Sequence, residues 1–360
     1  MPSVVPVMET METPVDLDVH RIVEVAYSSS VASKACLRSA FRPESSEEVS
    51  MMSVSRNAEP VVPIDPATQI GIVSLTVADL QRSLDYYTQA LGFAVLEKRA
   101  QEAALGAEGK LLVLLIEQRG ARPWPTDGVT GLYHFAILLP SRADLGRWLR
   151  HYLSLGFPPP GQGDHLVSEA FYLRDPDGHG IEVYRDRPRS EWQWNQGRVR
   201  MATGPVDVQG MVQEADRQGG SWQGLPKGTI LGHIHLQVGD LTRAEEFYHR
   251  LLGFDIVSTF PNALFISAGK YHHHLGLNTW HSAGVGPPPA DTAQLRFFTL
   301  SFASDAARNA AASHLARSGY PLVCTEKAWS VRDPWGNLLF LHTNSVDYSV
   351  ATSLNAEASA

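Results

Sequence analysis

The feature that most constrains the fold is a repeat, because a strand pattern followed by an amphipathic helix pattern occurs four times along the chain. Residues 70–93, IGIVSLTVADLQRSLDYYTQALGF, predict a strand, a helix capped by Asp79 and a stop at Gly92. Residues 231–254, LGHIHLQVGDLTRAEEFYHRLLGF, have the same order, with Asp240 as the cap and Gly253 as the stop. Weaker copies are GLYHFAILLPSRADLGRWLRHYLSLGF at 131–157 and LRFFTLSFASDAARNAAASHLARSGYP at 295–321.

Each helix pattern is followed by short strand candidates, so the repeating unit is β-α-β-β-β. The candidates are FAVLEKRA and LLVLLIEQ in the first unit, SEAFYLRD and GIEVYRD in the second, FDIVSTF, ALFISAG and HLGLNTW in the third, and AWSVRDP and NLLFLHT in the fourth. A unit of this size cannot bury its curved sheet alone, so the units should pair. The sequence therefore predicts an α+β fold of four βαβββ modules paired into two cup-shaped sheets. Alternate strand residues should point into each cup.

The boundaries of the repeat predict the domain organisation. Residues 68–200 would hold the first pair of modules and 226–345 the second pair, joined by a linker at 201–225. Residues 1–65 show no sustained period, so we expect a mostly disordered N-terminal extension. Residues 346–360 are expected to be a flexible tail.

Composition restricts the class of partner. With 44% hydrophobic and 19% charged residues, the chain is that of an ordinary globular protein, long enough for a sizeable core. A net charge of −8 argues against nucleic acid or an anionic membrane surface as the partner. Cys36 and Cys324 give no disulfide framework, which suits a cytoplasmic location, and no apolar run approaches the roughly 18 residues of a membrane span.

One stretch in the second module carries a spaced set of polar residues. GDHLVSEAFYLRDPDGHGIE, at 163–182, places a glycine, a histidine, a tyrosine, an Asp-Pro-Asp-Gly turn and a closing glutamate in order. The turn alone is a weak signal, since VRDPWGN at 331–337 contains it too. The full spacing is specific, and its members are Gly163, His165, Phe171, Tyr172, Asp175, Pro176, Gly178 and Glu182.

With these residues and the four modules, residues 68–345 resemble the vicinal oxygen chelate superfamily. More closely, they resemble the type I extradiol ring-cleavage dioxygenases and, within them, the catechol 2,3-dioxygenase group of bacilli. The resemblance implies an enzyme that inserts O2 into catechol or a substituted catechol and yields a 2-hydroxymuconic semialdehyde. Catechol-type molecules and O2 would then be its partners, and we also predict a homo-oligomer.

The resemblance also implies a site that holds Fe(II), with Mn(II) left open, through two histidines and one carboxylate. Glu182 matches the carboxylate ligand and His134 the first histidine. His233 matches the second histidine, and His235 is the alternative, because it lies two residues on and shares the same strand face.

Further residues match positions that act on the substrate. The run KYHHHLGLNTW at 270–280 supplies His273 as the acid/base, with His274 as the neighbouring alternative. His165 and Tyr172 would hydrogen-bond the catecholate oxygen or the intermediate. Two other functions stay open, namely another metal-dependent member of the superfamily (a glyoxalase, epimerase or thiol transferase) and a non-catalytic protein that binds an aromatic ligand.

The ligand set departs from the family's arrangement. In the family the three ligands come from modules three and four, but here Phe297 and Phe340 hold the histidine and glutamate positions of module four, and Ile72 holds the histidine position of module one. If His134, Glu182 and His233 bind one metal, modules two and three must share a cup. Modules one and four would then share the other cup, which we expect to be packed with aromatic side chains.

Overall fold

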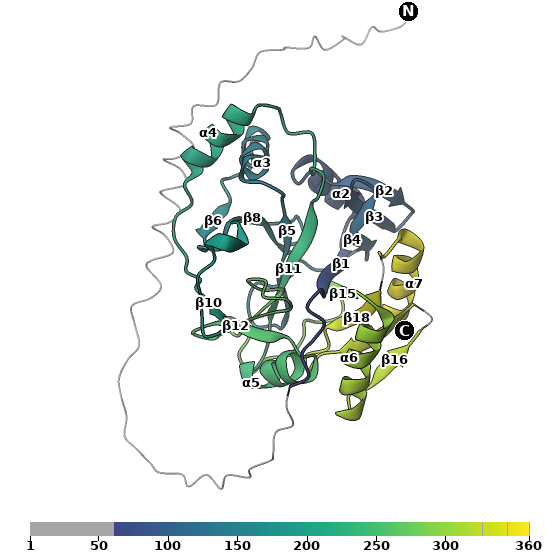
Figure 1. Cartoon of the computed structure of the whole chain (residues 1–360). Coiled ribbons are helices and arrows are strands. Elements are labelled where there is room, and N and C mark those ends of the chain that lie inside the picture. Colours follow the sequence, from purple (N-terminus) through teal and green to yellow (C-terminus); the bar gives the residue numbers. More distant parts are fainter. Residues whose placement is uncertain (1–60, 326, 344, 360) are drawn as a thin grey trace, which may run out of the picture. The chain divides into compact units, whose positions relative to one another are not determined.

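The computed structural model describes residues 61–325, 327–343 and 345–359 (Figure 1). Most of the predicted disordered extension therefore lies outside the described residues. Residues 61–65 are described, and they differ from the prediction, because Ile64 is buried and its amide donates to the Gly253 carbonyl at 2.9 Å. The backbone hydrogen bond to Gly253 holds Ile64 against the third module, where its apolar side chain is buried.

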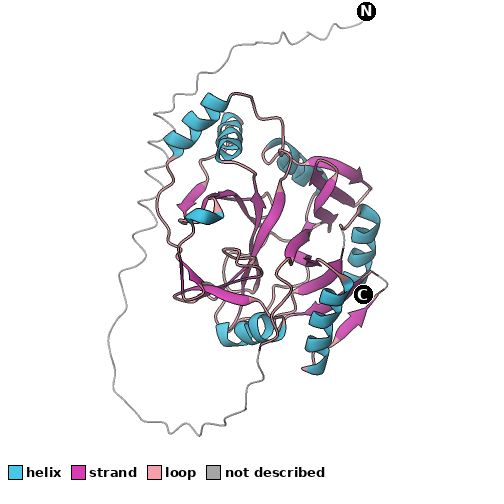
Figure 2. Ribbon diagram, viewed as in Figure 1, coloured by secondary structure: helices cyan, strands magenta, loops and turns pink. Residues whose placement is uncertain are grey.

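Helices and strands follow one another in the β-α-β-β-β order that the repeat predicts, and Figure 2 shows both kinds of element. In the first module Leu80, Leu84 and Tyr87 are buried, and Asp79 caps the helix by accepting from the Arg82 amide. Module one comprises β1 (Gln69–Val77), α2 (Leu80–Gln89), β2 (Ala94–Lys98), β3 (Glu102–Ala107) and β4 (Lys110–Glu117). Module two comprises β5 (Gly131–Leu138), α3 (Arg142–Ser154), β6 (Gly161–Asp164), β7 (Ser168–Arg174) and β8 (Gly180–Asp186).

The second half of the chain repeats this order, and Asp240 caps its first helix as predicted. Module three comprises β11 (Ile230–Gln237), α5 (Leu241–Ala244) continued by the π-helix η3 (Glu245–Leu251), β12 (Asp255–Phe260), β13 (Ala263–Ser267) and β14 (Leu275–Asn278). Module four comprises β15 (Leu295–Phe302), α6 (Asp305–Arg317), β16 (Leu322–Cys324), β17 (Ala328–Arg332) and β18 (Leu338–Thr343).

Two eight-stranded sheets confirm the predicted fold class, and they pair the modules as a metal site shared by His134, Glu182 and His233 would require. One sheet has the order β16-β17-β18-β15-β1-β4-β3-β2 and joins modules one and four, where β1 pairs antiparallel with β15. The other has the order β12-β13-β14-β11-β5-β8-β7-β6 and joins modules two and three, where β5 pairs antiparallel with β11. We call them the 1–4 sheet and the 2–3 sheet.

The segment between modules two and three contains regular structure. It holds the short 3-10 helix η2 (Arg189–Glu191), the strands β9 (Trp194–Asn195) and β10 (Arg198–Val199), and the helix α4 (Val208–Gln218). Part of the predicted linker is thus a helix, capped by Asp207 and buried at Met211 and Val212. It packs closely on α3, since a Cβ on Gly146 would lie 2.8 Å from the Met211 carbonyl oxygen. The predicted domain boundaries at 200 and 226 stay a prediction.

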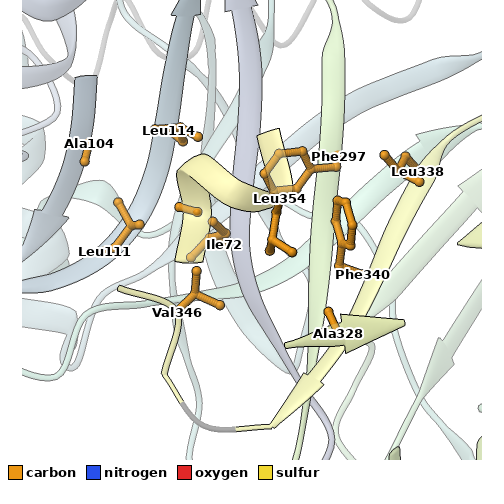
Figure 3. Packing of buried hydrophobic residues seen from close by; sticks show 11 residues of the cluster. Ile72, Ala104, Leu111, Leu114, Phe297, Ala328, Leu338, Phe340, Val346 and Leu354 are labelled. Carbon is orange, nitrogen blue, oxygen red and sulfur yellow. The ribbon is translucent and has the colours of Figure 1, made fainter. Parts of the chain in front are cut away.

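The C-terminal segment is a helix, α7 (Tyr348–Ala358), where a flexible tail was expected. Asp347 caps it, and its Ala351 and Leu354 are buried against the 1–4 sheet (Figure 3). They join Phe297 and Phe340, whose ring centroids are 5.1 Å apart in an edge-to-face contact, and Ile72. The positions that would carry ligands in this sheet are therefore filled by a hydrophobic core, which is mostly aliphatic and not aromatic as expected, because α7 and the strands of module one supply leucine and alanine side chains beside the two phenylalanines. No helix in the described ranges combines the length and apolarity that a membrane span requires.

Candidate metal centre

Three adjacent strands of the 2–3 sheet bring together the three predicted ligands. Ala136 of β5 is opposite Glu182 of the parallel strand β8 and opposite His233 of the antiparallel strand β11. His134 lies two residues before Ala136, so its side chain is on the same face as Ala136. Residues distant in sequence therefore converge because β5 lies between β8 and β11.

The geometry of the three side chains is compact. His134 Nε2 lies 3.1 Å and His233 Nε2 3.0 Å from Glu182 Oε2. One donor atom from each of the three residues lies within 4.8 Å of the other two, and all three residues are buried. His134 Nε2 has no hydrogen-bond partner of good geometry in the described part of the chain. A buried imidazole nitrogen left in this state suits a metal ligand, because an unsatisfied buried polar atom is otherwise costly.

The electrostatics of the cluster favour a cation. Burial would raise the pKa of the Glu182 carboxyl, but His233 and His134 beside it hold that pKa well below its usual range. Burial lowers the pKa of His233 despite the neighbouring carboxylate. An ionised carboxylate next to a neutral imidazole is the state in which both groups donate lone pairs to a metal. Two histidines and one carboxylate fit Fe(II) or a similar divalent ion.

His235, the alternative ligand, has a different partner. Its Nε2 lies 3.0 Å from Asn278 Nδ2, and the amide orientation is set by the Trp280 amide, which donates to Asn278 Oδ1 at 3.1 Å. Because an amide nitrogen only donates, His235 Nε2 is an acceptor and its lone pair is engaged. The structure thus groups His233, and not His235, with Glu182. Sequence reasoning missed Asn278, because nothing in the local pattern joins it to a histidine 43 residues away.

A pocket of about 480 Å³ opens in front of the cluster. His134 and Glu182 line it together with His273, His165, Tyr172 and His235. Phe260 and Trp280 also line the pocket, and both are partly exposed. The cavity is large enough for a single aromatic ring with substituents, and its wall is mostly apolar.

His165 and Tyr172 form a hydrogen-bonded pair on the pocket wall. His165 Nδ1 lies 2.9 Å from the Ala202 carbonyl oxygen, to which it donates. Its Nε2 is then an acceptor in the neutral ring and takes the Tyr172 hydroxyl hydrogen at 2.6 Å. Burial and the nearby Glu182 charge raise the pKa of Tyr172 well above its ordinary value, so its hydroxyl stays a donor.

The three-histidine run divides into different environments. His273 lines the pocket, and its ring centroid lies 4.1 Å from that of His233. Burial, followed by the neighbouring histidines, lowers its pKa well below the ordinary value. His274 does not line the pocket, and its Nδ1 accepts from the Ala268 amide at 3.1 Å. The structure therefore favours His273 over His274 for contact with a substrate.

The fold and the site define a class of protein. The chain belongs to the glyoxalase/bleomycin resistance protein/dioxygenase superfamily, whose sequence profile matches residues 69–183 and 230–341. This membership confirms the resemblance predicted from the sequence.

Individual relatives lie within this class. Catechol-2,3-dioxygenase of Bacillus subtilis strain 168 is 45% identical over 271 residues, which cover 74% of this chain and 94% of that protein. A solved structure from Bacillus subtilis subsp. subtilis str. 168, assigned as a dioxygenase, matches with a TM-score of 0.53 at 15% identity, over 78% of this chain and 87% of that chain. Glyoxalase I from Zea mays gives a TM-score of 0.47 at 19% identity, over 81% and 95% of the two chains. At such identities, the 0.53 match supports the fold alone.

Proposed function

We propose that this protein is an extradiol ring-cleaving dioxygenase that inserts O2 into catechol or a substituted catechol. The observation that carries the proposal is the group of His134, Glu182 and His233 beside a ring-sized pocket. Support comes from the 45% identity to a catechol-2,3-dioxygenase that is covered over 94% of its length. The product would be a 2-hydroxymuconic semialdehyde, and the metal would be Fe(II), with Mn(II) as the alternative.

The residues present fit this chemistry. When bound, Fe(II) would lower the pKa of the catechol hydroxyls and provide a position for O2. The apolar pocket wall would orient the ring and limit access of water. His273, buried beside His233, would hold a proton of the substrate hydroxyl through its ring nitrogen. Because its hydrogen goes to His165 Nε2, the Tyr172 hydroxyl would accept a hydrogen bond from a hydroxyl of the substrate, and His165 would orient it.

One assay tests the proposal. The protein is loaded anaerobically with Fe(II), mixed with catechol in air-saturated buffer, and followed by oxygen uptake together with the yellow ring-opened product. We expect one O2 consumed per product formed, and no consumption by Glu182→Ala. Absence of oxygen uptake with catechol and with its 3- and 4-substituted analogues would refute the proposal.

The same preparation tests the alternative metal and the alternative functions. Loading with Mn(II) in place of Fe(II) identifies the active metal. Turnover of a hemithioacetal without oxygen uptake would indicate a glyoxalase, and catechol binding without turnover a binding protein. The homo-oligomer and the cytoplasmic location stay predictions.

A further inference from the structure

A second buried histidine lies behind His273 and makes two hydrogen bonds of its own. His272 is fully buried, its Nε2 lies 2.8 Å from Asp186 Oδ1, and its Nδ1 lies 2.8 Å from His273 Nδ1. We propose that Asp186 and His272 are positioning residues that hold His273 in the tautomer with its proton on Nδ1. The inference rests on the proposed function for its catalytic meaning.

The proton positions follow from what each group can donate. An ionised carboxylate only accepts hydrogen bonds, so His272 Nε2 carries the proton that lies toward Asp186. A neutral imidazole has one N–H, so His272 Nδ1 is the acceptor. The hydrogen bond between the two Nδ1 atoms then uses the proton of His273 Nδ1. In neutral His273 the remaining nitrogen, Nε2, therefore carries a lone pair.

The surroundings of His272 hold this arrangement in place. Its ring centroid lies 4.2 Å from that of Tyr271, 5.2 Å from that of Trp192 and 6.2 Å from that of Tyr184. With aromatic rings around it, the His272 ring has Asp186 and His273 as its hydrogen-bond partners. An imidazole packed in this way has little freedom to turn over and exchange its two nitrogens.

The chain of hydrogen bonds is also tied to the candidate metal centre. Asp186 lies on β8 four residues after Glu182, so the two carboxylates are on the same face of one strand. The strand that supplies a metal ligand thus also anchors the histidine pair. A shift of β8 would move Glu182 and the support of His273 together.

The tautomer determines what His273 can do in the pocket. Its Nδ1 is engaged by His272, so Nε2 is the nitrogen that a bound molecule can meet. With the proton on Nδ1, Nε2 accepts a hydrogen bond from a catechol hydroxyl. The opposite tautomer would present an N–H, which a hydroxyl hydrogen cannot approach. Asp186 and His272 therefore select an acceptor at this position.

Nuclear magnetic resonance tests the tautomer without any activity. The full chain is labelled with ¹⁵N-histidine, and the His273 ring is assigned by its loss in His273→Gln. We expect a protonated Nδ1 and an unprotonated Nε2 in the metal-free wild type. His272→Phe should shift the pattern toward a protonated Nε2, and Asp186→Leu should do so in part. His274→Gln, in the same run of histidines, is the matched control and should leave the pattern unchanged.

Kinetics test the consequence. In Fe(II)-loaded His272→Phe, we expect kcat to fall by about 10- to 100-fold, by analogy with residues that hydrogen-bond and orient a metal-binding histidine. Bound iron should be unchanged, and KM should move by less than about threefold, because the pocket wall is retained. A protonated Nε2 in the wild type, or an unchanged pattern in both His272→Phe and Asp186→Leu, would overturn the inference. So would an unchanged kcat in a folded His272→Phe. A wild type that lacks dioxygenase activity would instead overturn the proposed function and leave the resonance result to decide the tautomer.

Discussion

His233 and His235 are two residues apart on the same strand face, yet they differ in what they contact. Asn278 occupies the Nε2 of His235, whereas the Nε2 of His233 lies beside Glu182. Both imidazoles are buried, and burial lowers the pKa of each. The hydrogen-bond partner, and not burial or charge, therefore separates a candidate ligand from a wall residue.

This difference predicts the effect of four substitutions on metal content. His134→Ala, Glu182→Ala and His233→Ala should each lose most of the bound iron, while His235→Ala keeps it. Changes outside the ligand set typically weaken metal binding by about 10- to 100-fold, so loss of a ligand should exceed that range. Iron per chain is measured after desalting. Iron retained in His233→Ala but lost from His235→Ala would reverse the assignment.

The lowered pKa of the buried His274 predicts that the stability of the protein depends on pH. Burial and the neighbouring His272 lower its pKa to about 3 in the folded protein, against 6.5 for an ordinary histidine. Below pH 6.5 the unfolded chain binds a proton that the folded chain does not, so stability falls with falling pH, by up to about 1.4 kcal/mol per unit from this group. Above that pH the group has no effect.

Urea unfolding of the metal-free protein at pH 7.5 and 5.5 measures this loss. His274→Gln removes the titrating group and should show a smaller difference between the two pH values. An equal difference in the wild type and the variant would show that His274 does not titrate as expected.

At the scale of elements, the strand β6 explains the glycine that opens the motif. A Cβ on Gly163 would lie 2.7 Å from His165 Nε2, the atom that accepts the Tyr172 hydroxyl hydrogen. Gly161, two residues earlier on the same strand, has room, since a Cβ there would lie 3.4 Å from its nearest neighbour atom. The glycine of the Gly-x-His pattern thus makes space for a functional ring and not for the backbone.

Gly163→Ala should therefore displace His165 and lower kcat by about 10-fold, the cost of roughly one hydrogen bond. Gly161→Ala is the matched control and should retain kcat. Steady-state oxygen uptake compares the two variants. Equal activity in both would show that the His165–Tyr172 hydrogen bond does not contribute.

The helix α7 is a second element with a testable role. Leu354 is buried against the 1–4 sheet, while Ser353 beside it is exposed. Leu354→Ala should lower the free energy of unfolding by about 2–5 kcal/mol, the usual cost of a cavity in a core. Ser353→Ala should change it by less than about 0.5 kcal/mol. Denaturant unfolding measures both, and equal stability of the two variants would contradict a core role for α7.

At the scale of the molecule, the order of strands interleaves the two halves of the chain. Each sheet takes one module from the first half and one from the second, through the pairs β1–β15 and β5–β11. The half that ends at Gln218 contains His134 and Glu182, and the other half contains His233. Neither half holds the whole metal centre or a complete sheet.

The two halves of the chain, produced as separate fragments, should therefore bind iron and fold cooperatively only when they are together. A chain of residues 61–219 and a chain of 220–359, each expressed by itself, should bind no iron and show poor cooperativity of unfolding. Coexpression should restore iron binding and oxygen uptake. Iron bound stoichiometrically by residues 61–219 alone would contradict the shared site.

Some strands escaped prediction for local reasons. β3 (EAALGA) and β6 (GQGD) have few β-branched or aromatic residues, and β16 has only three residues, so their patterns are weak. The pairing with longer neighbours holds them in the sheets. Similarly, α7 has little amphipathic character in its sequence. That it packs against the 1–4 sheet can be seen only in the tertiary structure.

The sequence by itself determined the repeat, the α+β class and the small set of histidines and carboxylates from which the candidate metal centre is drawn. It predicted the pairing of modules two and three only on the condition that His134, Glu182 and His233 bind one metal. These inferences depend on local periodicity and on a spaced motif, and both are properties of the order of residues in the chain. Only the tertiary structure decided between His233 and His235, separated His273 from His274, and joined Asp186 to His272. The first depends on Asn278, 43 residues from His235, and the last joins residues 86 positions apart, while the second depends on which side chain faces the pocket; packing fixes all three.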